Sequence, residues 1–163
     1  MVPPLDSTFG EGRMQLPDLV AGLSAVPGCL GVETARTGSG KEVIFAWFAD
    51  KAAVLRWYSG RAHQTTIKAV FPEYVPEGPL RHVRDDVGPI MVIASLTESA
   101  ARPATGVELP ISQIAIELYA PLDGGLHFGG RFAPEGVRLE HMRDYTAFVT
   151  RGPPETSRPP AND

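Results

Sequence analysis

Apolar residues near the start of the chain recur every three to four positions, which is the period of an amphipathic helix. The residues are Leu16, Leu19, Val20, Leu23 and Val26. Pro17 suits a first helical turn, and Pro27-Gly28 ends the pattern. Two strand-like runs follow, at 29–35 and 42–48, with the turn sequence Thr37-Gly38-Ser39-Gly40 between them. The pattern therefore predicts a helix followed by a β-hairpin.

The second strand of this hairpin is apolar on both faces. Successive residues of a strand point to opposite faces, and here both sets are apolar: Val43, Phe45 and Trp47 on one face, and Ile44, Ala46 and Phe48 on the other. Helices can bury one face. The other face needs either a long excursion of the same chain or a second subunit.

A second helix is predicted after Asp50, which is a suitable N-cap before the apolar residues of 52–57. Gly60 is expected to break or kink it, and a short helix is expected over 65–71, closed by Pro72. Residues 72–87 then read as a long connection. The predicted order is thus two helical segments and a connection between the hairpin and the next strand.

Three further strand signals follow. Residues 90–96 are apolar on both faces, and Ile111–Tyr119 alternates between a drier and a wetter face. Asp123-Gly124-Gly125 is a strong turn signal, so Leu126–Phe132 is predicted to return as a hairpin strand. Residues 136–150 fit either a short helix or a strand. We expect one domain over 15–150, a flexible segment over 1–14 and a Pro-rich tail over 151–163.

Composition narrows the class of protein. The 163 residues are 43% hydrophobic, as in ordinary globular proteins. The net charge is −4 and the pI is near 5.6, so the protein would not attract a phosphate backbone and no nucleic-acid partner is expected. The first residues lack a signal-peptide pattern and no apolar run is of membrane-spanning length, which favours a cytoplasmic protein without a membrane partner. Cys29 is the single cysteine and reads as a small buried apolar residue.

Three short sequence motifs, in this order along the chain, resemble those of a known protein family. These are the run from Pro27 to Glu33 (PGCLGVE), the run from Phe45 to Ala53 (FAWFADKAA) and the run from Ser59 to His63 (SGRAH). The segment over about 15–70 is similar to the antibiotic biosynthesis monooxygenase-like family of the dimeric α+β barrel superfamily. The resemblance implies an α+β fold: a ferredoxin-like antiparallel sheet with helices on one face, which pairs across a homodimer into a barrel. A second subunit would then cover the second apolar face of 42–48.

The chain departs from this family at its beginning. The family starts with a strand before the first helix, whereas residues 1–14 contain Pro3-Pro4 and a Gly-rich stretch, which form a poor strand. We expect one of the extra C-terminal strands, Ile111–Tyr119 or Leu126–Phe132, to fill the vacant sheet position. Any site residue that the family carries on its first strand is missing here.

The resemblance implies oxygenation of a small aromatic or quinol-like ligand, or haem breakdown, in a pocket between sheet and helices. Trp47 and Trp57 are the candidate ligand-binding residues, because an indole ring can stack on a flat ligand. His63 is the candidate catalytic residue, as a base or an iron ligand. Core packing is the more common role of such tryptophans, and His63 is also explained as a helix cap or a solvent-exposed side chain.

The other histidines, His82, His127 and His141, show no metal-ligand spacing, so no metal site is expected. Two functions stay open. One is a cofactor-independent or haem-linked monooxygenase-like enzyme. The other is a non-catalytic dimeric module that binds a small apolar ligand or has a structural role, which the missing first strand favours slightly. Partner recruitment by the Pro-rich tail is a third and weaker hypothesis.

Overall fold

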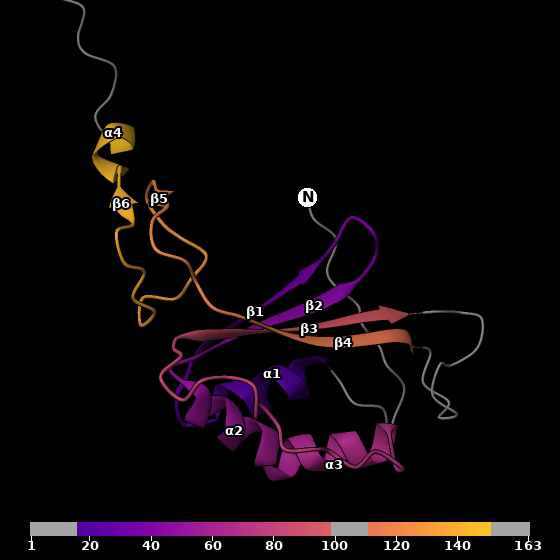
Figure 1. Cartoon of the computed structure of the whole chain (residues 1–163). Coiled ribbons are helices and arrows are strands. Elements are labelled where there is room, and N and C mark those ends of the chain that lie inside the picture. Colours follow the sequence, from indigo (N-terminus) through magenta and orange to yellow (C-terminus); the bar gives the residue numbers. More distant parts are fainter. Residues whose placement is uncertain (1–15, 99–110, 151–163) are drawn as a thin grey trace, which may run out of the picture. The chain divides into compact units, whose positions relative to one another are not determined.

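The computed structural model describes residues 16–98 and 111–150 (Figure 1). The expected flexible segment over 1–14 and the Pro-rich tail over 151–163 lie outside these residues. The contacts of the chain divide into two compact units, one ending at Pro121 and one beginning at Leu122. Residues 15–150, expected as one domain, are therefore described as two units.

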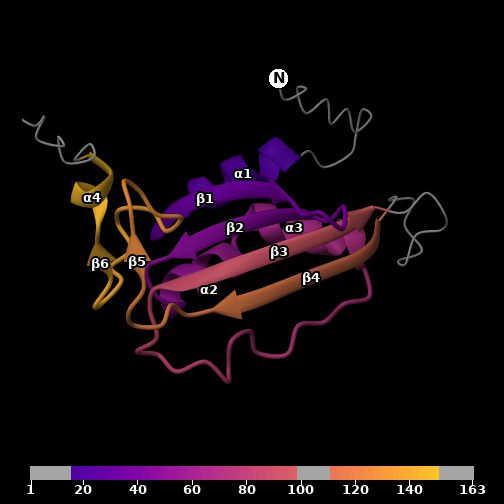
Figure 2. The same cartoon turned by 90° about the horizontal axis from the view of Figure 1, so that it is seen from above.

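The first unit is an α+β sandwich of one sheet and three helices. Its elements are α1 (Leu16–Ser24), β1 (Cys29–Arg36), β2 (Glu42–Phe48), α2 (Lys51–Ser59), α3 (Arg61–Val70), β3 (Ile90–Glu98) and β4 (Ile111–Tyr119). The four strands form one antiparallel sheet in the order β1-β2-β3-β4 (Figure 2). Figure 1 shows α1, α2 and α3 on the same side of this sheet. The predicted α+β class, an antiparallel sheet with helices on one face, is confirmed.

Local signals explain the start of these elements. The Asp50 carboxylate accepts a hydrogen bond from the Ala53 amide at 2.8 Å, so the predicted N-cap of α2 is confirmed. Gly60 has extended backbone angles between α2 and α3, so the predicted break is confirmed too. The third helix, however, begins at Arg61 and not at Thr65. The periodic apolar residues that predicted it lie only in its second half.

The core lies between β2, β3 and the helices. Phe48 and Ala53 are fully buried, and Val54, Ile90 and Val92 are each 2% exposed. The strand alternation sends Ile44, Ala46 and Phe48 to this side, so their neighbours Val43, Phe45 and Trp47 lie on the helix-free face. The prediction that β2 is apolar on both faces is therefore confirmed.

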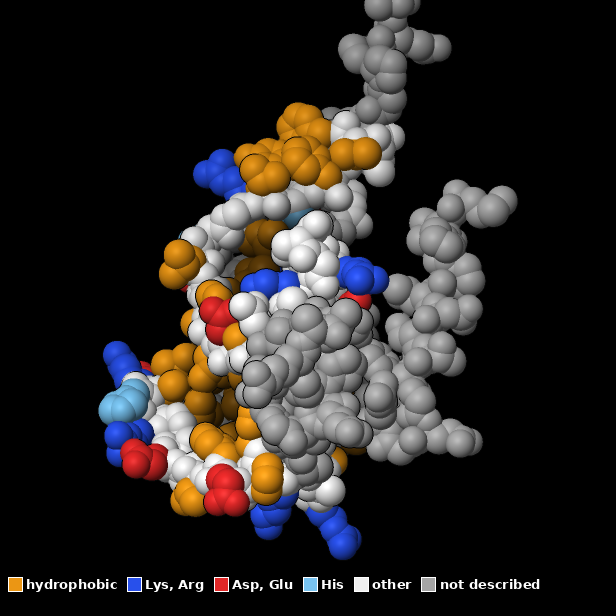
Figure 3. Space-filling view, turned by 90° about the vertical axis from the view of Figure 1, so that its right-hand side faces the viewer, with side chains coloured by type: hydrophobic (Ala, Val, Ile, Leu, Met, Phe, Trp, Pro, Cys, Tyr) orange, Lys and Arg blue, Asp and Glu red, His pale blue; other side chains and the backbone are white. Residues whose placement is uncertain are grey.

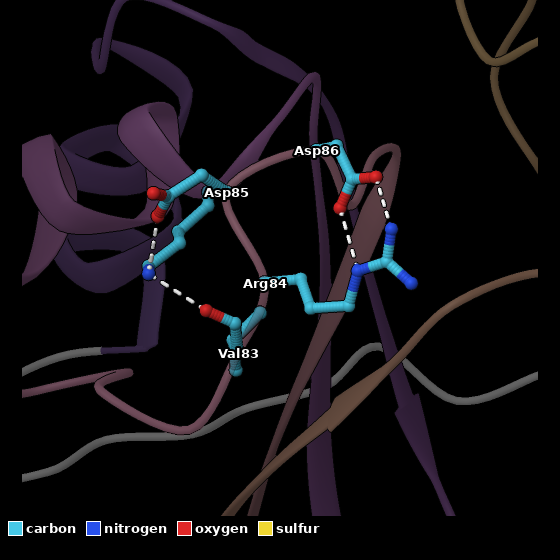
Figure 4. Close-up of polar contacts among 5 residues, drawn as sticks. Val83, Arg84, Asp85 and Asp86 are labelled. Carbon is cyan, nitrogen blue, oxygen red and sulfur yellow. Dashed lines mark hydrogen bonds and ion pairs between the residues drawn. The ribbon is translucent and has the colours of Figure 1, made fainter.

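The connection between α3 and β3 is fixed against the core. Leu80, Val83 and Val87 pack against the core cluster. The Lys51 ammonium, whose side chain is 15% exposed, donates to the Val83 carbonyl and to the Asp85 carboxylate, each at 2.7 Å (Figure 4). Arg84 pairs with Asp86 in the same segment, as Figure 4 also shows. A long connection without regular structure is thereby held at the start of α2.

The strand predictions for the C-terminal part are only partly correct. Ile111–Tyr119 joins the sheet at its edge, next to β3. Leu126–Phe132 does not, so the prediction of a hairpin between these two segments is wrong. β5 (Leu126–His127) instead pairs in parallel with β6 (Arg143–Asp144) in a separate two-stranded sheet. The turn signal at 123–125 is overridden because β5 finds its partner seventeen residues further along, and Tyr145 N donates to His127 O beside this pairing.

The second unit is small and held largely by polar contacts. It consists of β5, β6, α4 (Thr146–Thr150) and the loop between the strands. Nη2 of Arg131 lies within hydrogen-bonding distance of the carbonyls of Pro134, Glu135 and Val137, at 3.2, 3.2 and 2.7 Å. Only Ala133 and Val137 are buried among the described residues of this unit, whereas Phe148 is 74% exposed. Apolar side chains accordingly gather on the surface near α4, at the top of Figure 3.

Candidate functional site

The corner between α2 and α3 brings three rings together. Trp57 and Tyr58 lie in the last turn of α2, and the extended Gly60 turns the chain so that His63 lies in the first turn of α3. The ring centroid of His63 is 4.3 Å from that of Trp57 and 5.2 Å from that of Tyr58. Two of the three predicted site residues, His63 and Trp57, are thus in direct contact.

The aromatic contacts continue into the core. The rings of Phe48 and Trp57 have centroids 6.0 Å apart, so Trp57 lies between the fully buried β2 phenylalanine and His63. Such tilted aromatic pairs contribute about 0.5–1.5 kcal/mol each beyond their buried area. Trp57 therefore packs against the core and contacts His63 at the same time.

The Nε2 atom of His63 is the unusual feature of this corner. It is inaccessible to solvent and has no hydrogen-bond partner among the described residues. Burial lowers the pKa of His63 below its ordinary value of 6.5, so the imidazole is neutral at pH 7. A buried nitrogen without a partner costs about 1–3 kcal/mol, which a ligand hydroxyl or another donor could recover. Neither a helix cap nor a solvent-exposed side chain describes this residue.

Tyr58 extends the corner to the connection that follows α3. Burial, and next a hydrogen bond with the Tyr74 side chain, raise the pKa of Tyr58 above its ordinary value of 10.0. The side-chain amide of Gln64 donates to the Tyr58 backbone carbonyl at 2.6 Å, which ties the end of α2 to the start of α3. Sequence reasoning missed Tyr58 and Tyr74. Tyr58 could have been found from its position beside a predicted helix break, but Tyr74 lies sixteen residues further in an irregular segment.

Trp47 lies away from this corner. It alternates with Phe48 on β2 and so points to the helix-free face, where its neighbours across the sheet are Gly31 and Met91. The side chain is 6% exposed, and its indole N–H has no hydrogen-bond partner among the described residues. The three predicted site residues therefore lie on two faces of the sheet, with Trp47 on one and Trp57 and His63 on the other.

The corner does not fit a haem group in its present arrangement. A haem iron held through Nε2 of His63 would need access to this nitrogen, which is inaccessible to solvent and lies beside rings that are already in contact. In residues 16–98 and 111–150 no group of three or more His, Cys, Asp or Glu could hold a metal ion.

None of the described helices is long and apolar enough to cross a membrane.

The match to a known family lies within the first unit. Residues 12–69 match the family model of antibiotic biosynthesis monooxygenase (ABM), which covers less than half of the chain and ends within α3. The search of curated proteins and the search of solved structures give no match. The matched segment contains Trp47, Trp57 and His63 but neither β3 nor β4. Residues 12–69 are therefore similar to the ABM family, whose fold is the ferredoxin-like dimeric α+β barrel.

Proposed function

We propose that the α2–α3 corner binds a small aromatic or quinol-like molecule and that the protein is a cofactor-independent, monooxygenase-like enzyme. The observation that carries this proposal is the buried, neutral and unpartnered Nε2 of His63 beside Trp57 and Tyr58. The aromatic rings suit a flat apolar ligand, and the nitrogen suits its hydroxyl group. The similarity of the segment to the ABM family adds the reaction class.

The chemistry assigned to His63 is general-base catalysis. Neutral Nε2 accepts the proton of the phenolic hydroxyl, and the resulting phenolate is electron-rich enough to react with dioxygen, the second substrate. Oxidation of a phenol to a quinone then balances with one O₂: one oxygen atom enters the ring and the other leaves as water, which takes the hydroxyl proton held by His63 and the hydrogen of the ring carbon that is oxygenated. The pKa of His63 is lowered by burial, which keeps the base unprotonated at neutral pH.

Binding and turnover are measured separately with 1-naphthol as the probe. Trp57 is one of two tryptophans, so the Trp47→Phe variant makes its fluorescence a direct reporter of the corner. We expect naphthol to quench this emission and His63→Gln to weaken binding about tenfold, which corresponds to one lost buried hydrogen bond. The control is His82→Gln, because His82 is an exposed histidine in the connection before β3.

Oxygen uptake distinguishes the two candidate functions. An enzyme should consume O₂ with naphthol and lose this activity in His63→Gln while His82→Gln retains it. Binding without O₂ uptake would instead support the second candidate, a non-catalytic ligand-binding module. If naphthol does not quench Trp57 at all, the corner is aromatic packing and both ligand proposals fail.

We further propose that the protein forms a homodimer through the helix-free face of the sheet, as ABM proteins typically do. Phe45, Met91 and Ile93 are half-buried apolar residues on this face, and it has no helix of the first unit over it (Figure 1). Sedimentation velocity should show a dimer, and Ile93→Arg should produce monomers because it places a charge among these residues. Ala52→Arg, on the exposed side of α2, is the control and should stay dimeric.

A further inference from the structure

The C-terminal unit contains two histidine–aspartate pairs with nearly the same geometry. Nδ1 of His127 lies 3.7 Å from Oδ1 of Asp144, and Nδ1 of His141 lies 3.7 Å from Oδ2 of Asp123. Both distances exceed a good hydrogen bond, so neutral imidazoles gain little from their carboxylates. A protonated imidazole would carry a positive charge at ion-pair distance from each carboxylate.

These pairs bracket the backbone ladder that joins the two halves of the unit. Gly124 N donates to Glu140 O, Arg143 N to Gly125 O and Tyr145 N to His127 O, at 2.8, 3.1 and 2.9 Å. The His141–Asp123 pair lies at the first of these bonds and the His127–Asp144 pair at the last. Each pair joins one side of the ladder to the other, so a stronger attraction within a pair would resist separation of the two chain segments.

The buried atom of the first pair strengthens this interpretation. Nδ1 of His127 is inaccessible to solvent and has no hydrogen-bond partner among the described residues. Protonation places an N–H on this nitrogen, and the nearby carboxylate of Asp144 is its acceptor. Hydrogen bonds from Thr146, and then the charge of His127, lower the pKa of Asp144, so this carboxylate stays ionised where histidines ordinarily gain a proton.

Other charges around the ladder do not replace the histidines. Glu140 is adjacent to His141 but forms its own ion pair with Arg138, at 2.6 Å. The Arg143 guanidinium lies 3.5 Å from the Tyr145 hydroxyl, and Arg131 donates to backbone carbonyls. The remaining carboxylate of the described unit, Glu135, is exposed in the loop. The described residues of the unit thus hold four carboxylates and three guanidiniums, so protonation of both histidines changes the net charge from −1 to +1.

We propose that the two pairs form a pH-sensitive clamp that tightens the C-terminal unit when the medium becomes mildly acidic. At alkaline pH the ladder depends on its few backbone hydrogen bonds. At acidic pH two ion pairs hold it from both ends, and α4 is held with it because the Thr146 hydroxyl accepts from the Gly129 amide at 2.8 Å. The exposed Phe128 and Phe148, whose rings both contact the half-buried Tyr145, become a more rigid surface.

The clamp is tested by amide hydrogen exchange of the whole chain at pH 5.5 and pH 8.0, with each rate corrected for the intrinsic pH dependence of exchange. Protection of the Arg143 and Tyr145 amides should rise between about two- and tenfold on acidification, as two exposed ion pairs allow. Amides of β2 and β3 show that the first unit remains folded. Unchanged or falling protection of Arg143 and Tyr145 would overturn the proposal, as would a ladder unprotected at both pH values.

Variants separate the clamp from a general effect of acid. The His127→Gln/His141→Gln double variant should lose the pH-dependent gain, whereas His82→Gln should keep it. Asp123→Asn/Asp144→Asn is the second test, because asparagine can still accept the Thr146 amide but carries no charge. It should also lose the gain. A gain that persists in both double variants assigns the pH effect to other groups and refutes the clamp.

Discussion

The two units of this chain use different kinds of interaction. The first unit buries Phe48 and Ala53 completely between a four-stranded sheet and three helices, and its stability follows from apolar contact. The second unit buries only Ala133 and Val137 among its described residues and relies on one arginine and a short ladder. Regions with little buried apolar surface open more easily. The comparison indicates that the first unit holds its side chains in a fixed geometry, whereas the second unit opens more easily.

The largest expected difference between the units comes from removing a phenylalanine ring in each. Phe48→Ala should destabilise the first unit by about 3–5 kcal/mol, because the side chain is fully buried. Phe148→Ala, at a site 74% exposed, should change stability by less than about 1 kcal/mol. Urea unfolding followed by tryptophan emission reports the first unit, which contains both tryptophans, and hydrogen exchange of the Tyr145 amide, which donates to the His127 carbonyl, reports the second. Similar midpoints for the two variants would refute the contrast.

Glycine substitutions sharpen the view of the first unit as tightly packed. Gly28 has φ +91°, and a Cβ there would lie 2.6 Å from the Ala53 Cβ. Gly28→Ala should therefore cost about 2–3 kcal/mol, from the left-handed backbone and from overpacking against α2. Gly38→Ala in the β1–β2 turn has open space and should be neutral within about 0.5 kcal/mol. Thermal unfolding of both variants measures this difference, and equal melting temperatures would contradict it.

Arg131 tests whether polar contacts hold the second unit. Arg131→Gln removes the donor shared by the Pro134, Glu135 and Val137 carbonyls and should weaken the loop by about 1–3 kcal/mol. The Val137 amide, which donates to the Pro134 carbonyl, reports the loss by hydrogen exchange. The matched control is Arg138→Gln, whose side chain is 85% exposed. If both variants lose equal protection at the Val137 amide, the hydrogen bonds of Arg131 do not stabilise this loop more than an exposed arginine does.

The smallest expected effect concerns the connection between α3 and β3. The hydrogen bond and the charge of Lys51 lower the pKa of Asp85 below its ordinary value of 3.8. This contribution is present above the unfolded-state value and is lost as pH falls through the lower, folded-state value. Acid unfolding should therefore show a weaker pH dependence below about pH 4 in Lys51→Met than in the native chain. Lys68→Met, at an exposed position of α3, should behave like the native chain.

His63 shows how far the candidate site could be predicted. Its burial depresses the pKa, so protonation favours the unfolded chain and this residue removes stability as pH falls below its ordinary value of 6.5. The sequence nominated His63 and Trp57 through a resemblance in the order of motifs. It could not show that Trp47 lies on the opposite face, because alternation fixes two faces but not which one the helices cover. Tyr74 was not predictable, since irregular segments carry no period.

What the sequence by itself determined is local. The Asp50 cap, the break at Gly60, the β1–β2 hairpin and the doubly apolar β2 follow from hydrogen bonds and periodicities that involve neighbouring residues. Only the tertiary structure decided that β4 joins the sheet beside β3, that β5 pairs with β6, and that Trp57 and His63 meet around Gly60. The reason is that strand pairing and side-chain contact depend on which distant segments approach one another, and several arrangements satisfy the same local pattern.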